Sequence, residues 1–295
     1  RRRSSPSHRD LCCMGTNERT GSRPVPLPAY FGASTKADVF FHPYTNGGRP
    51  IRTQVMLTHH LLSLVQEGEK EVIVAGHREL VDASRMVLLA STSSIMSEHD
   101  LRGRPMRSLL IFIAPQFLLD FCARHGLKPK GTAAELLPMP QDDFTRLFAR
   151  SVEVLGPTAL NGDPALRRTK AEELLLYLHA KHPADFARFI AAAVKGRDEL
   201  PLRSVVALHQ DNNLSVPELA FLCHMSVSTF KRRFQEAYGL APGRYLHVRR
   251  MERAKAMLVR KLRPSEIYIE LGYGSLASFS TEFKKHFGVA PSAQP

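Results

Sequence analysis

The sequence predicts an α+β fold, in which an N-terminal antiparallel β-barrel with a helical pair precedes a C-terminal all-α domain. Three observations support this expectation. Short apolar runs separated by turn signals fill residues 40–113, the apolar period becomes helical after Pro115, and one helical pattern occurs twice after residue 200. The chain has 295 residues, of which 43% are hydrophobic, so it is long enough for two domains with separate cores.

Residues 1–28 form a basic leader that we expect to be disordered, because they show no apolar periodicity. They begin with three arginines and end with the proline-rich stretch Pro24–Pro28. No apolar run of the length found in secretory signals follows the arginines, and no segment of the chain approaches 18 uninterrupted apolar residues. We therefore expect a cytoplasmic protein without a membrane span.

Residues 29–195 are expected to form a regulatory and dimerisation domain that begins with a barrel over residues 40–113. Short apolar runs recur at about ten-residue spacing, with turn signals such as Glu67–Lys70 between them. This spacing predicts a small antiparallel barrel or sandwich, and a cupin-like barrel is the specific expectation. The runs are Val55–Leu57, Leu61–Val65, Val72–Val74, Met86–Leu89 and Leu109–Ile113.

The rest of this domain, residues 116–195, has a helical period. Apolar residues recur at three- and four-residue spacing in four segments that proline or polar residues separate. We expect helices at Gln116–His125, Asp142–Leu155, Pro164–His179 and Ala184–Val194. The third of them carries a leucine-rich stripe between Leu166 and Leu178, which predicts self-association through Leu174 and Leu178.

Residues 196–295 are expected to hold two helix-turn-helix units. In the first unit, Ser215 and Glu218 have the spacing of a capping box, and Ser226 is placed to cap a second helix. That second helix turns Phe230 and Phe234 inward and presents a cationic face. A short capped helix, a tight turn and an exposed basic helix together predict a DNA-reading head.

The second unit repeats the first along the sequence. Phe230 and Phe234 each lie 49 residues before their counterparts, Phe279 and Phe283, whereas Leu219 lies only 48 residues before Ile267. One additional residue therefore enters the second turn. Residues 242–259 between the units read as one helix of roughly 26 Å, the right order to hold two heads about one duplex turn, ~34 Å, apart.

These residues resemble the DNA-binding domain of the AraC/XylS family of bacterial transcription regulators over roughly residues 200–295. The resemblance implies a two-headed module that binds double-stranded promoter DNA in successive major grooves, commonly activates transcription, and works with RNA polymerase. The residues that carry it are Leu219-Ala220, Met225-Ser226, Phe230, Arg233-Phe234, Gly239, Pro242, Tyr245-Leu246, Arg249-Arg250, Ala254, Leu258, Ile267, Gly272-Tyr273, Phe279, Phe283–Lys285, Phe287-Gly288 and Pro291-Ser292.

Transferred residue by residue, the resemblance implies base-facing positions in both heads. Those of the first head are Ser228, Lys231 and Arg232, and those of the second are Leu276, Ala277, Ser278 and Thr281. Lys231 and Arg232 can donate to guanine N7 and O6, while the second head offers hydroxyls and apolar contacts. The sequence departs from the family at Tyr268, where a small alanine is usual, and at Thr281, where arginine is common.

The charge distribution agrees with a nucleic-acid partner. Residues 201–295 contain 14 Lys and Arg and 7 Asp and Glu, a net charge of +7 out of +13 for the whole chain. Such an excess gains affinity by neutralising phosphates and releasing counterions. The expected phosphate contacts are Arg244, Arg249, Lys284 and Lys285.

The N-terminal half is similar to the corresponding domain of activators of type III secretion genes. The shared stretches are His59-His60 with Glu67-Gly68, Ala114–Leu118 and Lys170–Leu175. This second resemblance implies that the domain self-associates into a homodimer and binds a protein antagonist. It leaves open whether the effector on this domain is a small molecule or a protein.

Two other classes of function stay open beside the regulator. A cupin-type metalloenzyme would need three ligands on one barrel face, but the N-terminal histidines lack the His-x-His plus Glu spacing. The cysteines, Cys12, Cys13, Cys122 and Cys223, match neither a zinc site nor a disulfide framework. We expect no enzyme activity, metal or cofactor. The second alternative is a protein-interaction adaptor whose double unit has lost DNA binding, which Tyr268 and Thr281 would favour.

Overall fold

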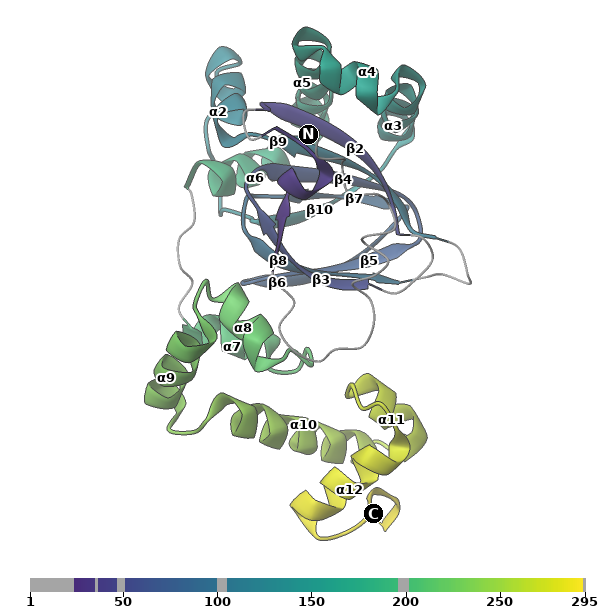
Figure 1. Ribbon diagram of the computed structural model, residues 1–295, viewed down its shortest axis with the longest axis vertical. Coiled ribbons are helices and arrows are strands. Elements are labelled where there is room, and N and C mark those ends of the chain that lie inside the picture. Colours follow the sequence, from purple (N-terminus) through teal and green to yellow (C-terminus); the bar gives the residue numbers. More distant parts are fainter. Residues whose placement is uncertain (1–23, 35–36, 47–50, 100–104, 196–201, 294–295) are drawn as a thin grey trace, which may run out of the picture. The chain divides into compact units, whose positions relative to one another are not determined.

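A computed structural model describes residues 24–34, 37–46, 51–99, 105–195 and 202–293 of the chain. The chain divides into two compact units, one ending at Asp198 and the other beginning at Glu199. The first unit contains the β-strands together with helices, and the second is entirely helical in its described part (Figure 1).

The first unit is built on two five-stranded sheets. One has the strand order β1 (Val25–Leu27), β3 (Ile51–Leu57), β8 (Ser93–His99), β5 (Glu69–Val74) and β6 (His77–Asp82). The other has the order β10 (Leu136–Pro140), β7 (Arg85–Leu89), β4 (His60–Glu67), β9 (Arg107–Ile113) and β2 (Val39–Thr45).

The expected closed barrel is wrong, because the two sheets are not hydrogen-bonded into one ring. The outer strand β10 contains Pro138 and Pro140, which have no N–H group to continue the ladder. The ladders are antiparallel except for β1 and β3, which pair in parallel. The sandwich, which the strand spacing allowed equally well, is therefore the architecture of this unit.

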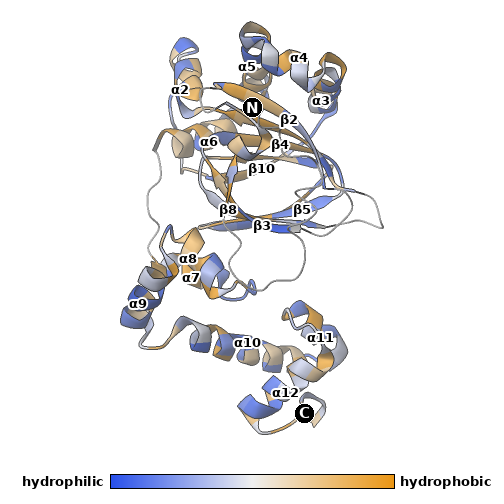
Figure 2. Cartoon of the chain, in the orientation of Figure 1, coloured by the Kyte–Doolittle hydropathy of each residue, from blue (hydrophilic) through white to orange (hydrophobic). Residues whose placement is uncertain are grey.

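The sheet that contains β4 and β9 is buried on both faces. Along β9, Leu110 and Phe112 belong to the core between the sheets, while Leu109, Ile111 and Ile113 belong to the core beneath the helices. Because successive side chains of a strand point to opposite faces, every residue of such a strand can be apolar. The apolar colour of these strands in Figure 2 reflects this double burial.

Five helices accompany this doubly buried sheet. Four of them, α2, α3, α5 and α6, were expected with ends within a few residues of those observed, whereas α4 was not expected. All contribute buried side chains to the core on the outer face of the sheet (Figure 1). Their bounds are α2 (Pro115–Arg124), α3 (Asp143–Leu155), α4 (Pro157–Gly162), α5 (Pro164–Lys181) and α6 (Pro183–Lys195).

Two further expectations for the first unit need correction. Leu174 and Leu178 do not form an outer stripe, because both side chains are buried against the sheet, with 1% and 0% exposure. The leader is not irregular to its end, since Val25–Leu27 forms β1 and the carbonyl of Leu27 accepts the Thr58 N–H at 3.0 Å. Residues 1–23 lie outside the described part of the chain.

Charged residues are buried between the two sheets. Burial lowers the pKa of Lys70 to about 8 and raises the pKa of Glu98, although each charge favours ionisation of the other. The Lys70 ammonium donates to Ser63 Oγ, and the Tyr44 hydroxyl donates to Glu98 Oε2 at 2.9 Å. These partners offset part of the desolvation cost of the pair. The alternating pattern of the sequence gives no signal for this pair.

The second unit consists of six α-helices and a short final 3₁₀ turn in its described part. The capping box expected at Ser215 and Glu218 is confirmed, and so is the N-cap at Ser226, whose side chain accepts the Thr229 N–H at 3.2 Å. The elements are α7 (Leu202–His209), α8 (Val216–Leu222), α9 (Val227–Tyr238), α10 (Pro242–Val259), α11 (Pro264–Glu270), α12 (Leu276–Phe287) and η2 (Pro291–Ala293).

Candidate nucleic-acid interface

The sequence repeat corresponds to a repeat of backbone geometry. Asn213 and Lys261, 48 residues apart, both have positive φ just before a capped helix. His224 and Gly272, also 48 apart, have positive φ in the turn that follows. The next N-caps, Ser226 and Ser275, are 49 apart, so the additional residue lies in the second turn, as the sequence predicted. The two heads are therefore copies of one structural unit.

The positive φ at Gly272 predicts how much a side chain at this position would destabilise the second head. We expect Gly272→Ala to destabilise the second head by about 1–2 kcal/mol, because a side chain in the left-handed region meets its own carbonyl. A Cβ atom there would lie no closer than 3.6 Å to Asn213, so backbone strain should be the main cost. Thermal unfolding of the full chain measures the loss. Gly274→Ala is the matched control, since φ at Gly274 is not positive and its Cβ would meet nothing within 4 Å.

Both heads are seated on the long helix α10. Tyr245, near its start, contacts Phe234 and Tyr238 of α9, with ring centroids 5.5 and 4.9 Å away. Its second half, from Met251 to Leu258, shares a core with Phe279 and Phe283 of α12. Figure 1 shows α9 and α12 near opposite ends of α10. One rigid element thus carries both candidate recognition helices.

Direct contacts also join the first head to the second. Arg253 of α10 donates through Nη1 to the carbonyl of Asp211, before α8, and its Nη2 forms an ion pair with Glu270 of α11. Asn213 Nδ2 donates to the carbonyl of Glu270 at 2.6 Å. These bonds restrict rotation of one head relative to the other. Sequence reasoning missed them, because 57 residues separate Asn213 from Glu270.

The first candidate recognition helix, α9, separates its core from its polar face. Phe230 and Phe234 are fully buried, while Ser228, Lys231 and Arg232 are exposed. Arg232 Nη1 forms an ion pair with Glu236 Oε1 at 2.9 Å, one turn further along the helix. This pair was not anticipated. This ion pair holds the Arg232 guanidinium against α9. The guanidinium must turn away from Glu236 to contact a base.

The second candidate recognition helix, α12, presents a different surface. Leu276, Ala277, Ser278 and Thr281 are all exposed, and together they offer hydroxyls and apolar atoms but no charge. Lys284 and Lys285 are exposed in the last turn. Figure 2 shows hydrophilic residues over much of α9 and on part of α12. Tyr268, the unusual residue of α11, is accommodated by packing against the core of this head.

Several basic residues of this unit take part in its own structure. Arg203 donates to the carbonyl of Ala237 at 2.6 Å and lies 5.5 Å from the centre of the Tyr238 ring. Arg250 lies 5.8 Å from the centre of the Tyr273 ring. Arg249, an expected phosphate contact, is only partly exposed and pairs with Glu252 at 3.1 Å. The exposed cations among the predicted positions are therefore Lys231, Arg232, Arg244, Lys284 and Lys285.

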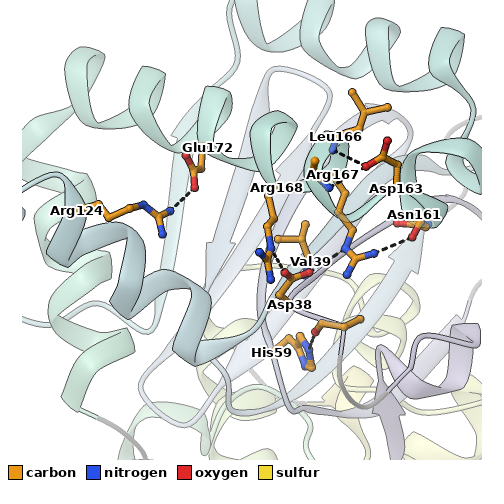
Figure 3. Close-up of polar contacts among 12 residues, drawn as sticks. Asp38, Val39, His59, Arg124, Asn161, Asp163, Leu166, Arg167, Arg168 and Glu172 are labelled. Atoms are coloured by element: carbon orange, nitrogen blue, oxygen red, sulfur yellow. Dashed lines mark hydrogen bonds and ion pairs between the residues drawn. The ribbon is translucent and has the colours of Figure 1, made fainter.

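Two adjacent histidines of the first unit, His59 and His60, take part in its internal hydrogen bonding, and Figure 3 shows one of the hydrogen bonds of His59. His59 Nε2 lies 3.0 Å from the carbonyl of Ala37, and its Nδ1 lies 3.0 Å from Thr58 Oγ1. His60 Nδ1 accepts the Ser91 N–H at 3.1 Å, and burial lowers the pKa of His60 to about 4. His60 is thus uncharged at neutral pH.

Among the described helices, none is long and apolar enough to cross a membrane.

Family models match part of each unit of the chain. Residues 219–294 match the family of the helix-turn-helix domain, and residues 60–189 match the ExsA N-terminal regulatory domain. The chain is 25% identical to the transcriptional regulator ExsA of Pseudomonas aeruginosa, over 65% of this chain and 70% of that protein. It is 28% identical to the virulence regulon transcriptional activator VirF of Yersinia enterocolitica, over 64% of this chain and 72% of that protein. An apo ToxT variant from Vibrio cholerae aligns with 88% of this chain and 97% of its own, at 15% identity and a TM-score of 0.39.

Proposed function

We propose that this chain, an AraC-type DNA-binding transcription regulator, activates transcription by inserting α9 and α12 into successive major grooves of promoter DNA under the control of its N-terminal unit. The observation that carries the proposal is the equivalence of the two heads on one helix. Each presents an exposed recognition face, and Arg253 and Asn213 fix their relative orientation.

The two heads divide the work of recognition. Lys231 and Arg232 on α9 supply charged donors for base edges, so the first head provides most of the direct discrimination. Leu276, Ala277, Ser278 and Thr281 on α12 supply weaker contacts, such as packing against a thymine methyl group. Lys284 and Lys285 anchor the second head on the phosphate backbone together with Arg249.

Selection of bound sequences from random DNA tests this proposal. The expected result is a bipartite site with two blocks of preferred bases about one helical turn apart, the block read by α9 being the more strongly preferred. Gel shifts of the full chain on that site should weaken steeply with salt. If no DNA sequence is enriched, and the chain instead binds other proteins with an affinity that does not depend on salt, the adaptor function would be supported.

Lys285 provides a second test, of the phosphate contacts. We expect Lys285→Ala to lower affinity for target and random DNA alike and to reduce the slope of log K against log salt by about one unit. Binding titrations at several salt concentrations measure both. Lys130→Ala is the matched control, because Lys130 is exposed in a loop of the other unit. A loss of base preference with an unchanged slope would contradict the phosphate role.

The N-terminal unit is proposed to regulate this activity through self-association and effector binding, with RNA polymerase as the partner of the bound activator. The match of residues 60–189 to a regulatory domain supports this role. Since Leu174 and Leu178 are buried, self-association needs another surface. On α3, Leu147 and Val154 are 68% and 74% exposed and lie seven residues apart, which places them on one helix face. We assign the homodimer contact to this face.

A further inference from the structure

Arg253 contacts both heads of the second unit at once. It lies in the half of α10 whose core residues pack against the second head. Its Nη1 donates to the carbonyl of Asp211 in the first head at 2.6 Å, and its Nη2 forms an ion pair with Glu270 Oε1 in the second head at 2.5 Å. Asn213 Nδ2 of the first head donates to the carbonyl of Glu270 at 2.6 Å. We call these three contacts the brace.

The segment that supplies the first head's half of the brace is itself held on α10. The Tyr245 hydroxyl donates to Gln210 Oε1 at 3.1 Å, and Leu214 is buried. Asn213 has a φ of 52°, a left-handed conformation that asparagine adopts more readily than most residues. The equivalent residue of the second head, Lys261, has a φ of 64° and is exposed. The repeat therefore accounts for the backbone at Asn213 but not for its amide side chain, which contacts the other head.

The brace differs from the ordinary surface ion pairs of this unit. Arg249 and Glu252 pair within one turn of α10, so their contact restrains no other element. Arg253 instead holds an acceptor from each head with one planar guanidinium, whose N–H groups have fixed directions. Its side chain is 28% exposed, which shields the contacts from solvent in part. The brace therefore restrains both the distance and the direction between the heads.

A restraint between the heads has a direct consequence for the DNA that they read. One base pair inserted between the two blocks of a site moves the second block by about 3.4 Å along the duplex and turns it by roughly 35° around the axis. A head that follows this movement must leave its partner. Hydrogen bonds of 2.6 Å do not survive a displacement of several ångströms. The intact brace is therefore compatible with one spacing of the blocks.

We propose that Arg253, together with Asn213, determines which spacing between the two base blocks the chain accepts. Both are positioning residues, because they act through the relative placement of α9 and α12 and not by contacting a base. The inference rests on the proposed function, since it requires both heads to lie on one duplex. It adds a source of specificity that the recognition faces themselves do not provide.

Competition binding of the full chain to spacing variants of its selected site tests the proposal. The wild type should prefer the selected spacing over sites with one base pair inserted or removed by on the order of 100-fold, because a shifted site breaks the brace. We expect Arg253→Met to lower this ratio about tenfold, since two hydrogen bonds of a charged group no longer have to break.

A matched variant separates the brace from a lost charge. Arg260→Met removes the same charge from an exposed position just after α10 and should keep the wild-type ratio. Relative to Arg260→Met, Arg253→Met should bind the shifted sites more tightly. A merely destabilised head would instead lose affinity for every site.

Asn213→Gly tests the brace without changing charge. Glycine keeps the positive φ at no steric cost, so only the amide donor is lost, and the ratio should fall about threefold. Lys261→Gly is its control, because it makes the same backbone change at the equivalent position of the second head. Should Arg253→Met fold poorly by circular dichroism, Asn213→Gly decides the question.

Two results overturn the inference while the proposed function stands. The wild type selects a two-block site but tolerates every spacing, or the brace variants keep the wild-type ratio. If the wild type selects no two-block site at all, the proposed function is wrong and this inference is wrong with it.

Discussion

Arg232→Ala is expected to weaken binding to the selected DNA site by about 1–3 kcal/mol and to relax the preference at one base position. The side chain lies on the exposed face of α9, between the buried residues Phe230 and Phe234. An arginine there can form two parallel hydrogen bonds with guanine, which alanine cannot replace. Competition binding against single-base variants of the site measures both the loss and the affected position.

The ion pair between Arg232 and Glu236 offers a sharp control. If Arg232 acted only by stabilising α9 through this pair, Glu236→Ala would reproduce the defect of Arg232→Ala. An exposed pair at this spacing contributes only about 0.3–0.5 kcal/mol, however, so it cannot account for a larger loss. We expect Glu236→Ala to keep the base preference and to raise affinity slightly, because it removes a negative charge near the DNA. If the Arg232→Ala variant bound both target and random DNA with the same affinities as the wild type, the base contact would be refuted.

The second unit could be predicted from the sequence because its signals are local. Helix starts are marked by side chains that bond to backbone groups two or three residues away. Ser215 and Glu218 mark one start, and Ser226 marks another. The difference between the 48- and 49-residue offsets located the additional residue in the second turn. The contact of Asn213 with Glu270 could not be predicted, since it depends on how two helices cross.

The first unit was predicted less completely because its contacts are non-local. Apolar runs indicated strands, but no sequence pattern specifies that β1 pairs with β3 or that the ladders form two sheets. Strands β1, β2, β6, β8 and β10 were not among the expected runs, since charged, serine-rich or proline-containing segments give a weak strand signal. The leucine-rich segment of α5 was read as an outer surface because a buried stripe and a dimer stripe have the same period.

Replacing both Leu147 and Val154 by glutamate is expected to abolish cooperative binding to a promoter with two adjacent sites. The two exposed apolar side chains on α3 would contact a second copy, and four introduced carboxylates across such an interface would repel one another. Because linkage through a dimer raises apparent affinity, occupancy of the paired sites should require on the order of 100-fold more protein. Binding to a single site should not change. Footprinting on one-site and two-site DNA measures the difference.

A variant of a buried leucine shows how loss of the fold differs from loss of the dimer interface. Leu174→Ala should destabilise the first unit by about 2–5 kcal/mol, because it leaves a cavity beneath α5, whereas the α3 double variant should melt close to the wild type. Leu176→Glu is the matched surface control, since Leu176 is 40% exposed on α5 and should leave cooperativity intact. If the α3 double variant remains as cooperative as the wild type while Leu176→Glu does not, the dimer contact belongs to α5 after all, through its outer rather than its buried face.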